Sequence, residues 1–171
     1  MAKKKSLMMF IPGAIACVLG IVAFCMMFLQ AVHFSANDGG ISITLEEVGY
    51  TGAQLAFGYE EEVLVSSTTI LNFNIMTTLA FFLPLIGGVL ALIFKNGFIT
   101  KIVTTACFVV GAVFLFCTVA FMPVGLPEAS KDAFAASMWA LSAGPIVAGV
   151  LSIIGAVVCF FKGTIAKALT R

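Results

Sequence analysis

Four long runs of apolar residues that contain no Asp, Glu, Lys or Arg constrain this 171-residue chain more than any other feature. The runs are 28, 25, 21 and 24 residues long. Because a helix rises about 1.5 Å per residue, each run is long enough to cross a hydrocarbon core roughly 30 Å thick. Strands that cross a bilayer alternate in polarity, whereas these runs are apolar on every side. We therefore predict an all-α bundle of four transmembrane helices, at residues 7–34, 70–94, 102–122 and 138–161.

The composition excludes a soluble globular domain. Hydrophobic residues make up 61% of the chain and charged residues 10%, against about 45–50% and about 25% in soluble domains. A chain this short cannot hide so much apolar surface in its own core. We expect one membrane domain spanning residues 1–171, with the lipid bilayer as its first partner and no nucleic acid partner.

Basic and acidic residues are segregated between alternate connections. Segments 1–6, 95–101 and 162–171 hold eight of the nine basic residues, whereas segments 35–69 and 123–137 hold Lys131 and all eight acids. Lys and Arg in short loops stay in the cytoplasm. We therefore predict that the first three segments, including both termini, are cytoplasmic and that the other two are extracellular.

The first outer segment has the alternating pattern of a half-buried sheet. Apolar and polar residues alternate over 41–46 and again over 54–59, and a turn is expected between them at 49–52. Residues 63–65 add a third short apolar segment. We predict a small extracellular antiparallel sheet of two or three strands that buries its apolar face against the helix ends.

A ridge of small side chains recurs every fourth residue along the fourth run. Its members are Ala136, Ala140, Gly144, Ala148, Ser152 and Ala156. Small residues allow helix backbones to approach closely in lipid, where van der Waals contact drives association. The ridge is expected to pack within the bundle, with contact between copies of a homo-oligomer as the alternative.

Six carboxylates form a candidate extracellular acidic surface. They are Asp38, Glu46, Glu47, Glu60, Glu61 and Glu62. Clustered carboxylates create a negative potential that attracts calcium or a basic partner surface. Their spacing fits no calcium-binding loop, so the alternative is a solvated charge run that protects a sheet edge from further pairing.

Residues with the spacing of a catalytic, cofactor or metal site are absent from the sequence. The single histidine, His33, would bind a metal or sense pH only if the fold brought it close to Asp38, and is otherwise expected to be a polar anchor at the membrane interface. All five cysteines lie within the apolar runs, so no disulfide framework is implied. We therefore assign no catalytic residue, no cofactor and no metal, and expect no enzymatic activity.

The predicted layout resembles that of the claudins and other tetraspan proteins. It has four spans, cytoplasmic termini and a larger first outer loop with short strands. Claudins carry a tryptophan and two cysteines in that loop, whereas the only tryptophan here is Trp139 and the outer segments contain no cysteine. No functional residue is therefore transferred from that family. The compact loops without cysteines are typical of a bacterial plasma membrane.

Protein–protein contact is the function class that these features favour. The chain is expected to be a structural, adaptor or accessory subunit that contacts other membrane proteins or itself. An oligomeric small channel or transporter is the alternative, because four spans without charges make a poor conduit alone. A membrane enzyme has the least support from the residue types.

Overall fold

The structure is a computed structural model that describes residues 10–38, 41–63, 66–94, 97–132 and 134–169. Within these residues, four helices are long and apolar enough to cross a membrane. The predicted set of long apolar helices is therefore confirmed. They are α2 (Ile11–Cys25), which the 3-10 turn η1 (Met26–Phe28) extends, α4 (Ile75–Ile93), α5 (Phe98–Phe116) and α8 (Ala143–Phe160).

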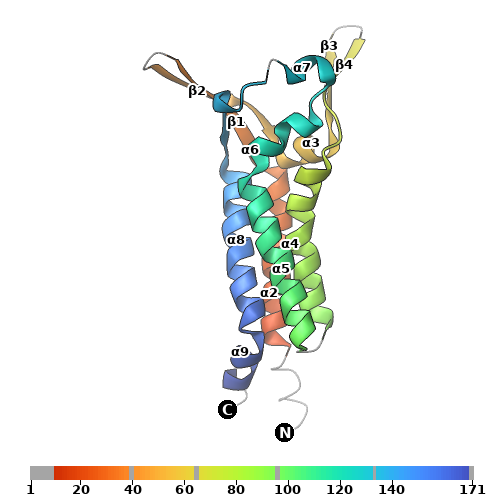
Figure 1. Cartoon of the computed structure of the whole chain (residues 1–171), viewed down its shortest axis with the longest axis vertical. Coiled ribbons are helices and arrows are strands. Elements are labelled where there is room, and N and C mark those ends of the chain that lie inside the picture. Colours follow the sequence, from red (N-terminus) through yellow and green to blue (C-terminus); the bar gives the residue numbers. More distant parts are fainter. Residues whose placement is uncertain (1–9, 39–40, 64–65, 95–96, 133, 170–171) are drawn as a thin grey trace.

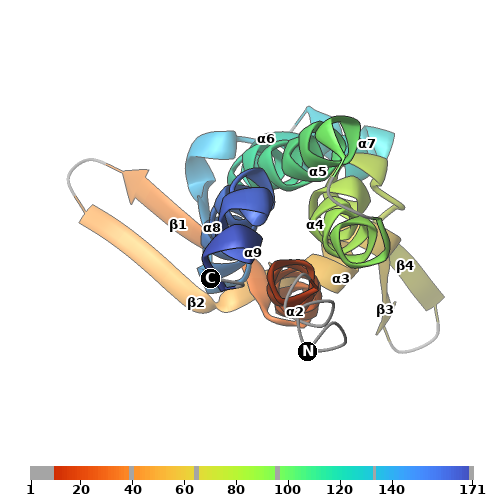
Figure 2. The same cartoon turned by 90° about the horizontal axis from the view of Figure 1, so that it is seen from below.

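The four helices form an antiparallel bundle in which each packs against two neighbours (Figures 1 and 2). Helix α2 lies diagonally across the bundle from α5. Helices α4 and α8 each pack against both α2 and α5. The start of α2, the end of α8 and the short helix α9 (Lys162–Leu169) lie at one end, called here the α9 end. All strands lie at the other end, called here the sheet end.

Helices α2 and α4 approach so closely that backbone meets backbone. A Cβ added at Gly13 would lie 2.6 Å from the carbonyl oxygen of Ala91, and one at Gly20 would lie 2.5 Å from that of Pro84. From the other side, a Cβ at Gly88 would lie 2.9 Å from the carbonyl oxygen of Ala16. Glycines on both helices therefore set the distance between them.

Large apolar side chains fill the centre of the bundle. Phe81, Phe108 and Leu115 are completely buried. The hydroxyls of Thr104 and Ser152, also buried, donate to carbonyls one turn back in their own helices, at 2.8 and 2.7 Å. Both hydroxyls are thus satisfied by the backbone of their own helix.

The first two apolar runs are longer than the helices they contain. Run 7–34 leaves the helix after Phe28 and continues as strand β1 (Gln30–Asp38), and run 70–94 begins in strand β4 (Ser66–Leu71). Ala31, Val32 and Leu71 are buried there, in a separate cluster at the sheet end. The parts of these strands that lie within the runs, residues 30–34 and 70–71, contain no Asp, Glu, Lys or Arg, so no charge in the sequence marks the end of the helix.

The third and fourth runs are shifted as well. Helix α5 begins at Phe98 and therefore includes Lys101, and beyond Phe116 the chain continues as the short helix α6 (Thr118–Phe121). Helix α8 begins at Ala143, after Ser142, instead of at residue 138. Strand β5 (Trp139–Leu141) occupies the start of that run because it pairs with β1.

The sheet end holds two small antiparallel sheets. Strand β2 (Ile41–Thr51) pairs with β1, which pairs with β5 on its other side, so the order is β2-β1-β5. Strand β3 (Tyr59–Val63) pairs with β4 in a separate hairpin. The expectation of a small antiparallel sheet is confirmed, but β5 and residues 30–34 of β1 come from segments predicted as helix.

The strand predicted at 54–59 is wrong in its main part, because Gly52–Phe57 forms the helix α3. Thr51 and Gln54 form a capping box at its start: the Thr51 hydroxyl accepts from the Gln54 amide at 3.2 Å, and the Gln54 side chain accepts from the Thr51 amide at 2.8 Å. Gly58 follows the helix with φ +94°, a conformation that glycine adopts without a steric cost. Of the third predicted segment, Val63 ends β3, and residues 64–65 lie outside the described residues.

Short helical turns complete the second connection at the sheet end. They are η2 (Met122–Gly125), α7 (Glu128–Lys131) and η3 (Ala136–Met138).

Candidate functional site at the sheet end

The sheet of β2, β1 and β5 extends sideways beyond the bundle as a projecting hairpin (Figures 1 and 2). Its inner part is held by β5 through Val32, His33 and Phe34 of β1, whereas the rest of β1 pairs with β2 alone. Because β2 is the last strand in the order, no described strand pairs with its outer edge. The backbone groups along that edge are available to another chain.

An aromatic cluster anchors the base of this hairpin to the bundle. The ring of Trp139 stacks on Tyr50, with centroids 5.7 Å apart, and meets Phe34 edge to face at 5.8 Å. Tyr59 lies 6.3 Å from Tyr50. The four side chains come from β5, β2, β1 and β3, so they join the two sheets.

Sequence reasoning missed this cluster because it placed Trp139 inside a helix. Tryptophan and tyrosine are enriched at membrane interfaces, and that enrichment was the available signal that Trp139 stands at a helix end. Burial raises the pKa of the Tyr50 phenol, with smaller contributions in the same direction from Glu61 and Tyr59. The negative charge of Glu61 therefore lies close enough to the aromatic cluster to disfavour ionisation of Tyr50.

His33 is used structurally and does not meet Asp38. Its Nδ1 lies 2.7 Å from the hydroxyl of Ser142, the residue before α8, so this contact connects β1 to the helix. Asp38 is five residues further along the same strand, which places the two backbones about 16 Å apart. The structure thus keeps the two hypothetical site residues apart. Within the described residues, no three His, Cys, Asp or Glu side chains group to hold a metal ion.

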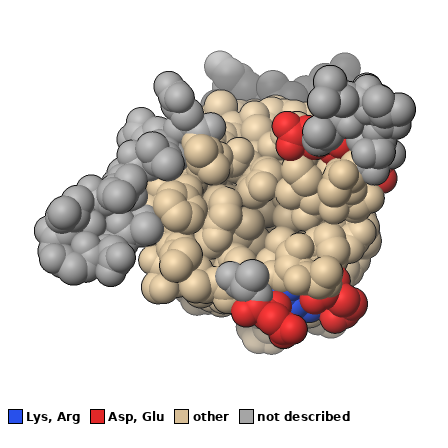
Figure 3. Space-filling model, turned by 90° about the horizontal axis from the view of Figure 1, so that it is seen from above, with Lys and Arg blue, Asp and Glu red and all other residues tan. Residues whose placement is uncertain are grey.

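Exposed acidic side chains occupy two separate areas of the sheet end (Figure 3), and of the six carboxylates of the candidate acidic surface only Glu60 and Glu61 have described side chains. Glu60 and Glu61 are exposed on β3, and Glu60 accepts a hydrogen bond from the Thr69 hydroxyl at 3.3 Å. Glu128 and Asp132 are exposed near α7, where Lys131 pairs with Glu128 at 2.6 Å. The side chains of Asp38, Glu46, Glu47 and Glu62 lie outside the part of the chain that the structure describes.

The small-residue ridge divides at the start of α8. Gly144, Ala148, Ser152 and Ala156 are buried in the bundle, where α8 packs on α2 and α5. Ala136 is exposed in η3, and Ala140 pairs with His33 in β5, so these two lie outside the helix and are not part of a helical ridge. The change from helix to strand at Leu141 ends the four-residue repeat in space, although the repeat continues in the sequence.

All five cysteines lie within the described residues, and none is in a disulfide. No family of known proteins, no curated protein and no solved structure matches this chain.

Proposed function

We propose that the chain is a non-enzymatic, multi-pass protein of a bacterial plasma membrane that acts through protein–protein contacts, as a structural, adaptor or accessory subunit. The open edge of β2 carries this proposal. The partner adds a strand to that edge and is either a segment of another membrane protein or the same edge of a second copy.

The distribution of charge supports an orientation with the sheet end outside the cell. Lys101, Lys162 and Lys167 lie at the α9 end, whereas the exposed acids described above lie at the sheet end. Lys and Arg near the ends of transmembrane helices favour the cytoplasmic side. Both termini are therefore cytoplasmic in this proposal, and the hairpin faces the outside.

The stability of a hairpin supports partner binding at β2. An isolated two-stranded hairpin is at best marginally stable in water. In the outer part of the hairpin, residues 35–38 of β1 pair with residues 41–44 of β2, and neither segment has another strand partner within the described residues. An added strand supplies main-chain hydrogen bonds and covers the edge, which is a recurrent mode of recognition.

The packing of the bundle argues against a channel within a single copy. Phe81, Phe108 and Leu115 fill its centre. A conduit would therefore have to form between copies of the chain. The buried residues of the ridge on α8 are not available for that contact, because they already pack inside the bundle.

Site-specific photo-crosslinking in intact cells tests the proposal. A photoreactive residue at Val48, which is 48% exposed on β2, should give discrete cross-linked protein bands. The same residue at Ala129, exposed on α7 at the same end, is the matched control and should give fewer.

Proline substitutions at adjacent positions of β2 identify the edge. N–H groups alternate between the two sides of a strand, so Ile43→Pro and Thr44→Pro remove one N–H that faces β1 and one on the outer edge. The variant that loses the outer N–H should retain its thermal stability and lose the cross-link from Val48. Cross-linking that survives both substitutions, or no protein cross-link from any position along β2, would contradict the proposal.

A further inference from the structure

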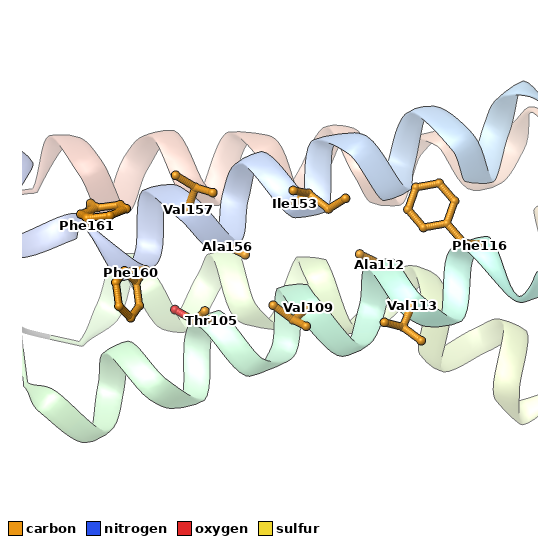
Figure 4. A pocket seen from close by; sticks show the side chains of 10 residues that line it. All are labelled: Thr105, Val109, Ala112, Val113, Phe116, Ile153, Ala156, Val157, Phe160 and Phe161. Carbon is orange, nitrogen blue, oxygen red and sulfur yellow. The ribbon is translucent and has the colours of Figure 1, made fainter.

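A second surface lies on the membrane-facing side of the bundle, between α5 and α8 (Figure 4). It is a groove of about 470 Å³, and small side chains at Ala112 and Ala156 form part of its lining. Phe116 stands at one end, and Phe160 and Phe161 stand at the other. The remaining lining residues are Thr105, Val109, Val113, Ile153 and Val157.

The length of the groove corresponds to one leaflet of a bilayer. From Thr105 to Phe116 along α5 the rise is about 16 Å, at about 1.5 Å per residue. Half of a hydrocarbon core roughly 30 Å thick is about 15 Å. An acyl chain lies within one leaflet, so it matches a groove of this length.

The α9 end of the groove is positively charged. Lys101 lies one turn before Thr105 on α5, and its Nζ is 2.8 Å from where a Cβ on Gly163 would be. Lys162, only 6% exposed, donates through its Nζ to the carbonyl oxygens of Ala91 and, at 3.0 Å, Phe94 at the end of α4.

The Lys101 ammonium lies close enough to Lys162 to affect its pKa. Burial lowers the pKa of Lys162, the Cys159 thiol opposes this effect, and the positive charge of Lys101 lowers the pKa further. The sequence places every Asp and Glu in segments 35–69 and 123–137. No acidic side chain of the described residues is therefore at this end to balance the two lysines.

We propose that this groove binds an anionic phospholipid of the inner leaflet, with an acyl chain along α5 and α8 and the phosphate at Lys101. The Lys162 ammonium donates to the carbonyls of Ala91 and Phe94 and adds positive potential near Lys101. The two lysines of the site lie at the α9 end, opposite the proposed partner edge of β2, so headgroup binding does not depend on what the sheet end binds.

Native mass spectrometry of the full chain in a mild nonionic detergent tests the proposal. Phosphatidylglycerol and phosphatidylcholine with identical acyl chains are the probes. The wild-type protein should retain phosphatidylglycerol preferentially. Lys101→Gln should weaken that retention about fivefold, because a basic residue close to an anionic lipid surface contributes about 1 kcal/mol and about 1.4 kcal/mol corresponds to a tenfold change in affinity. Lys101→Arg should preserve it.

Matched controls separate the headgroup from the chain. Lys131→Gln makes the same charge change at the sheet end and should leave retention unchanged. Val157→Trp fills the groove and should weaken retention of both lipids, whereas Val18→Trp, at a residue of α2 that is 59% exposed, should not. If Val157→Trp fails to fold, Val113→Trp at the other end of the groove replaces it.

Equal retention of the two lipids by the wild-type protein would overturn the proposal. Unchanged preference in Lys101→Gln would overturn the headgroup site, and unchanged retention in the groove-filled variant would overturn the acyl site.

Discussion

At the scale of single residues, a few polar side chains hold the ends of helices. Asn74 precedes α4 and is completely buried. Its Oδ1 accepts from the amides of Met76 and Thr77 at 3.1 and 3.3 Å, and its Nδ2 donates to the carbonyl of Phe121 at 2.7 Å. One side chain therefore caps α4 and joins it to α6.

Asn74→Ala should destabilise the protein by roughly 2–4 kcal/mol, because it removes a helix cap and leaves the Phe121 carbonyl buried without its donor. Unfolding in mixed micelles, followed by circular dichroism, measures this loss. Asn72→Ala, at an exposed side chain two residues earlier, is the matched control and should change little. Equal stability of the two variants would show that the Asn74 contacts contribute nothing.

Tyr50 is expected to titrate above its ordinary range. The chain has two tyrosines, so Tyr59→Phe leaves Tyr50 as the only phenol, and its ionisation can be followed by absorbance. Burial raises its pKa above 10.0 in the folded protein. The folded state then holds its proton when the unfolded state has lost it, so stability should fall as pH rises above 10.0.

Glu61→Gln in the same background should move the titration back towards lower pH, since the charge of Glu61 raises the pKa as well. A phenol that titrates identically in native and denatured protein would contradict the packing of Tyr50 against Trp139.

At the scale of elements, glycines decide how the helices meet. The α2–α4 contact is made by Gly13 and Gly20 against carbonyls of α4, and by Gly88 against a carbonyl of α2. Between α5 and α8 the pattern is different: Gly149 and Gly155 accommodate the rings of Phe116 and Phe108. The first contact is backbone on backbone, and the second is ring on backbone.

Gly20→Ala should destabilise the protein by about 1–3 kcal/mol through overpacking, even though alanine favours helix by about 1 kcal/mol. The added Cβ would lie 2.5 Å from the Pro84 carbonyl oxygen, and a backbone atom cannot move aside as a side chain can. Chemical unfolding in micelles measures the change, with Val18→Ala on the exposed face of α2 as control. A stabilised Gly20→Ala protein would mean that the two helices are further apart.

At the scale of the whole molecule, the two ends differ in both charge and structure. One end holds both small sheets and exposed acids, and the other holds α9 and three described lysines. The proposed membrane orientation follows from this difference, and both the partner edge and the lipid groove depend on which end is inside.

Cysteine labelling with a membrane-impermeant maleimide tests that orientation. Glu61→Cys should react in intact cells, whereas Lys167→Cys should react only after the membrane is permeabilised. The unsubstituted chain, whose five cysteines all lie within its apolar runs, measures the background. Reaction of Lys167→Cys in intact cells would reverse the assignment of the two ends.

Several features of the fold were predictable because their cause is local. Four charge-free runs predict four helices, since an ionic side chain is costly in hydrocarbon wherever the neighbouring helices lie. The capping box of Thr51 and Gln54 was also readable, but the alternating residues at 54–59 suggested a strand instead. For the candidate site, the acidic surface stays a prediction of which the structure describes only the exposed Glu60 and Glu61, whereas the roles of Trp139 and Lys162 could not be predicted without knowing what they contact.

The sequence by itself determined which segments are apolar enough to enter a membrane and at which connections the charges lie, because both properties belong to residues one at a time. Only the tertiary structure decided where each helix ends. Residues 30–34 and 139–141 lack Asp, Glu, Lys and Arg, as do the helices beside them, and they become strands because β1 finds partners in β2 and β5. Backbone hydrogen bonds can be satisfied within a helix or between strands, and pairing between distant segments is not encoded in any one of them.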